Sequence, residues 1–218
     1  MSGLIKICGL TRAEDAAFCA KAGADWLGFI FHPQSPRAVS PEMAAGFETG
    51  PAKRVGVFVN QKPDEILKIM AAARLDLAQL HGGQKADFIR AVGPEKVIMV
   101  HWPANFQTPA LLAEAVENTK DAAWHLFDAG KSGGGHGQKL DLDFIRRAQI
   151  TRPWLLAGGL DGAAVGRLDL SGLNGLAGFD FNSALEDAPG QKNKKMVLEA
   201  VAAVKRNGTS KNQVRCHQ

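Results

Sequence analysis

Short apolar runs alternate with segments of helical period along most of the chain. Eight runs rich in Val, Ile, Leu and Phe begin at Leu4, Trp26, Arg54, Leu75, Lys96, Ala123, Trp154 and Leu176. Amphipathic segments of helical period lie between them, notably 13–23, 63–74, 108–118, 142–149 and 193–208. Several apolar runs contain almost no polar position, which is typical of parallel strands covered on both faces.

A strand and helix unit that repeats eight times in about 200 residues predicts an α/β fold, a closed (β/α)8 TIM barrel. We expect one domain over residues 1–207, followed by a disordered polar tail at 208–218. A Rossmann-like open sheet is the alternative, but no G-x-G-x-x-G opens the first helix after the first strand. In a barrel the functional groups gather at the C-terminal ends of the strands.

The net charge of +4 and the pI of about 9.0 raise the question of a nucleic-acid partner. From residue 205 onward the chain has four basic residues and no acidic ones, namely Lys205, Arg206, Lys211 and Arg215. Without them, 22 basic residues face 22 acidic ones. The predicted barrel is therefore neutral, and we expect no nucleic-acid partner.

Neither a signal sequence nor a membrane span is visible, because nowhere do about eighteen apolar residues follow one another. The three cysteines, Cys8, Cys19 and Cys216, are an odd number without paired spacing. This argues against a disulfide framework and fits a reducing compartment. We expect a soluble, cytoplasmic protein with no membrane partner.

The first strand ends in a cysteine beside a glycine. Alternation along the strand places Lys6 and Cys8 on its inner face and Ile5 and Ile7 on its outer face. We expect the Lys6 ammonium to lower the pKa of the thiol, whose thiolate could act as a base or nucleophile. The alternative is that Cys8 is a small apolar filler of the core, and this role is expected for Cys19.

Asp128 ends the sixth apolar run and precedes a glycine-rich segment, residues 129–139. A carboxyl group at a strand end can act as a general acid when burial raises its pKa. A capping or loop-ordering role is the alternative. The P-loop order G-x-x-x-x-G-K-[ST] is absent from this segment, so nucleotide binding is not expected there.

The ends of the seventh and eighth runs predict a phosphate site. Gly158 and Gly159 follow the seventh run, and Asn182 and Ser183 follow the eighth, before a stretch (184–190) that could form a short extra helix. In TIM barrels these two loops and such a helix commonly bind phosphate through backbone N–H groups. A simple turn is the alternative for the glycine pair.

Two further polar residues follow strands. Arg37, in a loop stiffened by two prolines, could bind a carboxylate through two hydrogen bonds, although a solvated charge is the commoner role. His81 ends the fourth run, where a structural role is slightly favoured over a catalytic one. The histidines and cysteines show no metal-binding spacing, so we expect no metal.

The stretches KICGLT, GADWLGFIFHPQSPRAVSP, RVGVFVN, LAQLHG, LFDA, LLAGGL and GFDFNSALEDAPGQKN closely resemble phosphoribosylanthranilate isomerase of tryptophan biosynthesis. The resemblance covers residues 5 to about 205. It implies an Amadori rearrangement of N-(5-phosphoribosyl)anthranilate without metal or cofactor. One departure from the family pattern is Ala184, where glycine is usual, so that a backbone requiring positive φ there would be impaired.

The resemblance also implies roles for individual residues. Asp128 would be the general acid that protonates the ribose ring oxygen, and Cys8 the general base that takes the C2 proton. Arg37 would hold the anthranilate carboxylate. The phosphate would lie at Gly158, Gly159, Asn182 and Ser183. We add His81 and Asp180 to the expected substrate-binding residues.

Closure of the barrel would bring strand eight beside strand one, so we expect Asp180 to pair with Lys6 and to weaken its effect on the thiol. Two other functions are considered. The related isomerase of histidine biosynthesis usually has an aspartate at the position of Cys8, and a non-catalytic phosphometabolite binder would bind without turnover. The expected assembly is a monomer or a homodimer.

Overall fold

The computed structural model describes residues 3–129 and 141–213, with side chains of the last helix described to residue 207. Parallel strands close into a barrel and follow one another around it in chain order. They are β1 (Leu4–Ile7), β2 (Trp26–Ile30), β3 (Lys53–Phe58), β4 (Leu77–Leu80), β5 (Val97–His101), β6 (Trp124–Asp128), β7 (Trp154–Ala157) and β8 (Leu176–Phe181). The predicted (β/α)8 barrel is confirmed.

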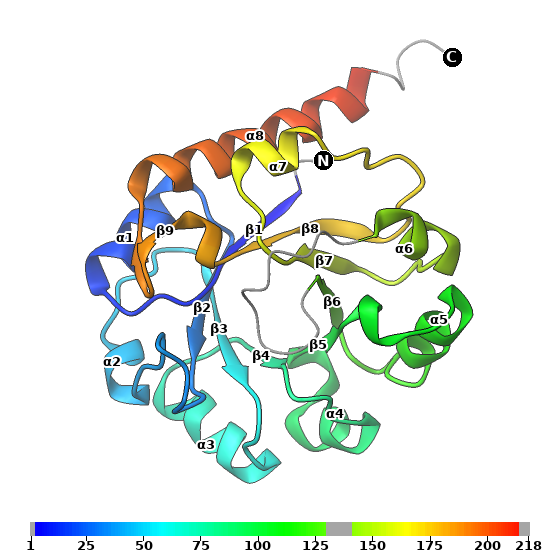
Figure 1. The fold of residues 1–218 in the computed structure, drawn as a ribbon. Coiled ribbons are helices and arrows are strands. Elements are labelled where there is room, and N and C mark those ends of the chain that lie inside the picture. The colour runs from blue at the N-terminus through cyan, green and yellow to red at the C-terminus, as the bar shows by residue number, and fades with distance from the viewer. Residues whose placement is uncertain (1–2, 130–140, 214–218) are drawn as a thin grey trace.

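Helices surround the strands as an outer ring, and α7 and α8 lie side by side (Figure 1). The α-helices are α1 (Ala13–Ala22), α2 (Pro41–Ala45), α3 (Pro63–Ala72), α4 (Ala86–Val92), α5 (Pro109–Glu117), α6 (Leu142–Ala148), α7 (Gly162–Gly166) and α8 (Lys194–Gln213). Short 3₁₀ helices are η1 (Pro94–Lys96), η2 (Pro103–Asn105) and η3 (Ser183–Leu185). No described helix is both long and apolar enough to cross a membrane.

Local sequence signals explain where the helices begin and end. Thr108 Oγ1 and Asp161 Oδ1 accept N–H bonds from the first turns of α5 and α7 at 3.3 Å and 2.6 Å. Gly23, with φ of 105°, ends α1 in the left-handed conformation that glycine adopts readily. The short helices α2 and α7 have five residues each, too few to show helical periodicity in the sequence.

Two apolar layers enclose the strands. The outer layer, between strands and helices, includes Ile5 and Ile7 of β1, as the alternation predicted. The inner layer fills the barrel with Trp26, Val55, Leu77, Ile98, Val100, Leu126, Leu155 and Ala157. Lys6 pairs in register with Asp180 across the seam between β1 and β8, and Asp128 ends β6. The barrel interior is therefore apolar below and polar toward the C-terminal ends of the strands.

The segment after β8 differs from its prediction. The expected short helix covers only η3 (Ser183–Leu185), and the chain then forms a hairpin of β9 (Glu186–Ala188) and β10 (Gln191–Lys192). Pro189 and Gly190 explain the difference, because this pair favours a tight turn and Gly190 has φ of 81°. The hairpin brings Lys192 into register with Glu186.

The domain boundary at residue 207 stays a prediction. Helix α8 continues to Gln213 in the structure, and residues 214–218 lie outside the described part of the chain.

Candidate active site

A cavity of about 730 Å³ opens at the C-terminal end of the barrel. It is lined by residues at the ends of all eight barrel strands, which lie up to 175 positions apart in the chain. All predicted site residues line it: Cys8, Arg37, His81, Asp128, Gly158, Gly159, Asp180, Asn182 and Ser183. The sequence had placed each residue at a strand end, and the closed barrel places all of them around one volume.

Cys8 lies at the wall of this cavity with 4% of its surface exposed. Its backbone N–H donates to Phe181 O at 2.8 Å, which ties the end of β1 to β8. Gly28 on β2 gives the thiol its space, because a Cβ there would lie 2.7 Å from Cys8 Sγ. The thiol is thus held between β8 and β2.

The predicted direction of the thiol's pKa is wrong. Burial raises the pKa of Cys8, and the opposing effect of Lys6 does not overcome it. The largest cause is desolvation of the buried thiol, and the negative charge of Asp180 further offsets the effect of Lys6. Cys8 is therefore a neutral thiol at neutral pH but, once ionised, a stronger base than an ordinary cysteine.

The expected pair of Lys6 and Asp180 is present. Lys6 Nζ donates to both carboxylate oxygens of Asp180 at 2.9 Å, and the Lys6 side chain is completely buried. Burial alone would lower the pKa of Lys6, but the facing carboxylate raises it. Asp180 lines the cavity, and its partner Lys6 lies two residues before Cys8 on the inner face of β1.

Asp128 stands on the other flank of the cavity, at the end of β6. His81 Nε2 lies 3.8 Å from its Oδ2, and Gln79 Nε2 lies 3.3 Å from His81 Nδ1. Burial lowers the pKa of His81, so the ring is neutral at neutral pH. The indole of Trp102 meets the His81 ring edge to face at 5.2 Å. These residues give the carboxyl group a largely water-excluded surrounding.

The loop after β7 packs against the residue that follows this carboxyl group. Gly158 has φ of 103°, and a Cβ there would lie 2.4 Å from the Cβ of Ala129, the residue after Asp128. Gly159 has φ of 62°, with open space where a Cβ would be. Ala184 lies in η3 and is not among the described residues with positive φ, so alanine is compatible with the backbone there.

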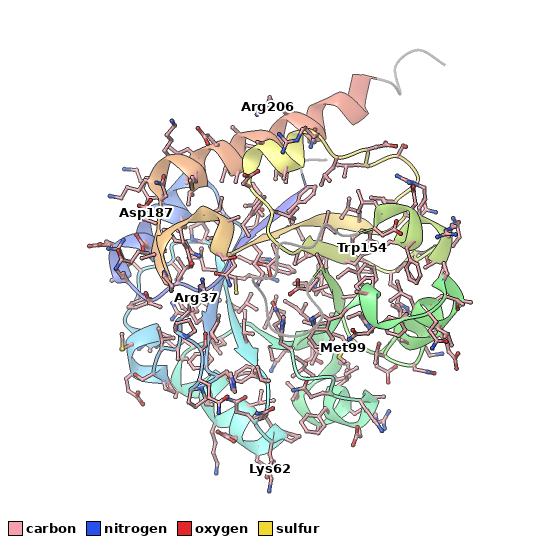
Figure 2. The ribbon with its side chains drawn as sticks, viewed as in Figure 1. Arg37, Lys62, Met99, Trp154, Asp187 and Arg206 are labelled. Carbon is pink, nitrogen blue, oxygen red and sulfur yellow. The ribbon has the colours of Figure 1, made fainter. Side chains whose placement is uncertain are left out.

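Arg37 is held by a residue that sequence reasoning missed. Its Nε and Nη2 donate to the Glu186 carboxylate at 3.0 Å and 2.6 Å, and it lies beside the hairpin of β9 and β10 (Figure 2). Lys192 Nζ donates to the same carboxylate at 2.7 Å and to Asn182 Oδ1 at 3.1 Å. The turn signal at Pro189 and Gly190 could have revealed the hairpin that pairs Glu186 with Lys192.

Two sequence predictions fall on segments that the structure does not describe. The glycine-rich segment after Asp128 lies outside the described residues from position 130 to 140, and so does Cys216 near the C-terminus. Cys8 and Cys19 are free cysteines. Among the described residues, no three His, Cys, Asp or Glu side chains cluster as metal ligands would.

Comparison with known proteins gives one consistent result. The family model described as N-(5'phosphoribosyl)anthranilate (PRA) isomerase matches residues 5–203. An N-(5'-phosphoribosyl)anthranilate isomerase of Desulfovibrio desulfuricans is 53% identical over 207 residues, which cover 94% of this chain and 97% of the relative.

Solved structures agree with this match. Phosphoribosyl anthranilate isomerase from Thermotoga maritima matches with a TM-score of 0.81 at 30% identity, covering 94% of this chain and 99% of that one. Another structure, of phosphoribosyl anthranilate isomerase in complex with reduced 1-(o-carboxyphenylamino)-1-deoxyribulose 5-phosphate, matches with a TM-score of 0.77 at 29% identity, covering 94% and 99%. Sequence and fold therefore resemble the same proteins over nearly the whole chain.

Proposed function

The chain belongs to the N-(5'-phosphoribosyl)anthranilate isomerase family, and from that membership we propose which of its residues perform the reaction. The enzyme catalyses the Amadori rearrangement of N-(5-phosphoribosyl)anthranilate to 1-(2-carboxyphenylamino)-1-deoxyribulose 5-phosphate in tryptophan biosynthesis. The resemblance seen in the sequence is confirmed. The histidine-pathway isomerase and the non-catalytic binder are not supported.

The first step of our proposal opens the ribose ring. Asp128 donates a proton to the ring oxygen as the bond from that oxygen to C1 breaks, while the nitrogen lone pair forms a C1=N iminium. The support is the position of Asp128 at the end of β6, inside the cavity and beside the neutral His81. A neutral histidine does not add a second positive charge beside the iminium.

The second step moves a proton from C2. The iminium acidifies this proton, so the small fraction of Cys8 that is ionised at neutral pH, a strong base because of its raised pKa, can remove it as thiolate. The electron pair of the C–H bond forms the C1=C2 bond of an enolamine, and the C1=N π pair returns to nitrogen. Tautomerisation of the enolamine then yields the aminoketose. The position of Cys8 on the flank opposite Asp128, with β7 and β8 between them in the ring, supports this division of roles.

The two anionic ends of the substrate determine its orientation in our proposal. The phosphate binds at the loops of Gly158, Gly159, Asn182 and Ser183, and the anthranilate carboxylate binds Arg37. Two of the five guanidinium N–H groups of Arg37 face Glu186, so others remain for a ligand. His81 and Asp180 border the space between the two ends.

The observation that carries this proposal is the single cavity shared by the thiol, the carboxyl group and both anion-binding ends. The test is a fluorescence assay of phosphoribosylanthranilate loss on Cys8→Ala and Asp128→Asn. We expect each to lose about 10²–10⁴-fold in kcat, as for a general base or acid. Cys19→Ala is the matched control, because Cys19 is a buried cysteine of α1 outside the cavity, and it should keep normal kcat.

A near-normal rate in Cys8→Ala or Asp128→Asn would remove that residue's role. Arg37→Ala should mainly raise KM, and an unchanged KM would argue against the carboxylate contact. The cytoplasmic location, the lack of a nucleic-acid partner and the choice between monomer and homodimer stay predictions from the sequence.

A further inference from the structure

A buried charge cluster lies behind the two anion-binding ends of the cavity. Glu186 accepts hydrogen bonds from Arg37 Nε and Nη2 and from Lys192 Nζ. Lys192 Nζ also donates to the backbone O of Asn182 at 3.2 Å and to its Oδ1 at 3.1 Å. One lysine thus connects the residue proposed for the carboxylate with a residue proposed for the phosphate.

The cluster carries an excess positive charge. Two cations, Arg37 and Lys192, share the single carboxylate of Glu186, whose pKa is lowered by these two partners although burial opposes the shift. The Lys192 and Glu186 side chains are 0% and 3% exposed, so water screens the excess charge weakly. The neighbouring Lys6 is already neutralised by Asp180.

The backbone around the cluster holds it in place. A Cβ at Gly9, which has φ of 73°, would lie 2.4 Å from Asn182 Oδ1 and 2.7 Å from Arg37 Cδ. The backbone N–H of Lys192 donates to the buried Asp15 of α1 at 3.0 Å. Arg37 and Asn182 thus pack directly against the turn after Cys8, and the strand that carries Lys192 is tied to α1.

We propose that Lys192 is a positioning residue for substrate binding, which shares Glu186 with Arg37 and orients Asn182. By taking part of the Glu186 charge, it leaves the Arg37 guanidinium with net positive charge for the anthranilate carboxylate. By bonding Asn182, it orients the loop after β8 toward the phosphate. The inference rests on the proposed roles of Arg37 and Asn182. It adds Lys192 as the residue that determines the net charge available on Arg37 and the orientation of Asn182.

Removal of Lys192 has a specific electrostatic consequence. In Lys192→Met, Glu186 would pair with Arg37 alone, and the cluster would become neutral. In the double variant Lys192→Met/Glu186→Gln, Arg37 would again carry one uncompensated positive charge, as in the wild type. Binding of a carboxylate should therefore follow the net charge of the cluster and not the number of residues removed.

The experiment measures the Kd of anthranilate, of inorganic phosphate and of the reduced product analogue by calorimetry, with Tm as a check of folding. We expect Lys192→Met and Lys192→Gln to weaken binding of the analogue about ten- to hundredfold, as for loss of hydrogen bonds to charged groups. Adding Glu186→Gln should restore much of the anthranilate affinity but not the phosphate affinity. Lys195→Met, which removes an exposed lysine of α8, is the matched control and should bind normally.

Three outcomes would overturn the inference. These are unchanged binding in both Lys192 variants, a double variant that binds anthranilate more weakly than Lys192→Met, or Glu186→Gln alone binding it much more weakly than wild type. The last two are the results expected if the cluster only stabilises the fold. Failure of the proposed function looks different, because Arg37→Ala would then leave the anthranilate Kd unchanged while the Lys192 variants would still reveal any effect on phosphate.

Discussion

At the residue scale, the chemistry of Cys8 depends on the groups that face it from other strands. Lys6 lies on its own strand, Asp180 faces it from β8, and Lys192 faces it from the hairpin. Lys6 and Lys192 favour the thiolate, whereas burial and Asp180 oppose it, and burial is the largest effect. A cysteine two residues from a lysine is therefore not sufficient to predict an acidic thiol.

Asp180→Asn tests the ion pair of Lys6 and Asp180. The change leaves a completely buried ammonium without its carboxylate, so we expect a loss of about 3–5 kcal/mol in the free energy of unfolding at pH 7. Because the pKa of Lys6 is raised in the folded wild type, the pair stabilises the fold below the unfolded pKa of about 10.4 and this contribution is lost as pH rises through the folded pKa.

In Asp180→Asn, the unpaired Lys6 ammonium should lose its proton as pH rises, which removes the free-energy cost of burying its charge. The difference in stability between wild type and variant should thus narrow from pH 7 to pH 10. Urea unfolding at the two pH values measures it. A difference below about 1 kcal/mol at pH 7, the range of exposed pairs, would mean that the pair is not buried as described.

Gly28→Ala tests the space reserved for the thiol. The added methyl group would lie 2.7 Å from Cys8 Sγ, so the thiol must turn away from its position in the cavity. We expect kcat to fall by about tenfold or more, because misplacement of a reacting group by about 1 Å can cost about 10²-fold. The backbone φ of Gly28 is ordinary for an L-residue, so the fold should survive.

Gly166→Ala is the control for this measurement. Gly166 ends α7, and a Cβ there would meet nothing within 4 Å. Steady-state kinetics should show normal kcat for Gly166→Ala, and equal rates for the two alanine variants would exclude a steric role of Gly28.

At the element scale, one buried arginine joins the ends of two helices. Arg54, at the start of β3, donates from Nε to Ala73 O at 3.2 Å and from Nη1 to Phe47 O at 3.0 Å. Its Nη2 donates to Ala44 O of α2. The guanidinium also lies over the Phe29 ring, 5.1 Å from its centroid. It thus satisfies carbonyls at the C-terminal ends of both α2 and α3.

Arg54→Met should destabilise the barrel without changing its chemistry. The variant leaves buried carbonyl groups without donors, each costing about 1–3 kcal/mol, so we expect a loss of at least about 2 kcal/mol. Arg54→Lys should recover little, since one ammonium cannot span three separate carbonyls. Denaturant unfolding measures the loss, and kcat of the folded variant should match wild type because Arg54 lies at the opposite end of β3 from the cavity. A lowered kcat would contradict this separation.

At the scale of the whole molecule, two buried histidines determine how the barrel responds to acid. His101 of β5 and His125 of β6 face each other, with Nε2 and Nδ1 3.1 Å apart. Burial, with the neighbouring charge of the partner ring, lowers the pKa of His101 to about 3, and burial lowers that of His125 to about 4. Both rings are neutral in the folded protein near neutral pH.

We expect stability to fall as pH decreases from about 6.5 toward 4. In this range the unfolded chain binds protons at both histidines and the folded barrel does not, so unfolding is favoured by about 1.4 kcal/mol per pH unit for each histidine. His125→Phe and His101→Phe should each reduce the slope of unfolding free energy against pH by about 1.4 kcal/mol per pH unit, which corresponds to the uptake of one proton. An unchanged slope in both variants would assign the acid sensitivity to other groups.

The sequence by itself determined the architecture. Eight apolar runs at regular spacing specify strands buried on both faces, and such strands with intervening helices close into a barrel. Period-two alternation in β1 correctly placed Ile5 and Ile7 outside and Lys6 and Cys8 inside. Because functional groups collect at the C-terminal ends of barrel strands, the positions of Asp128, Gly158 and the other predicted residues were also readable from the sequence.

Tertiary structure alone decided the electrostatics. Whether the Cys8 thiol is acidic depends on the sum of burial, Lys6, Asp180 and Lys192, and the last two are more than 170 residues away in the chain. The partnership of Arg37 with Glu186 likewise spans 149 positions and arises from a hairpin that the sequence pattern did not predict. Local pattern encodes which face a side chain takes, but desolvation and charge pairing depend on which distant groups the closed barrel brings together.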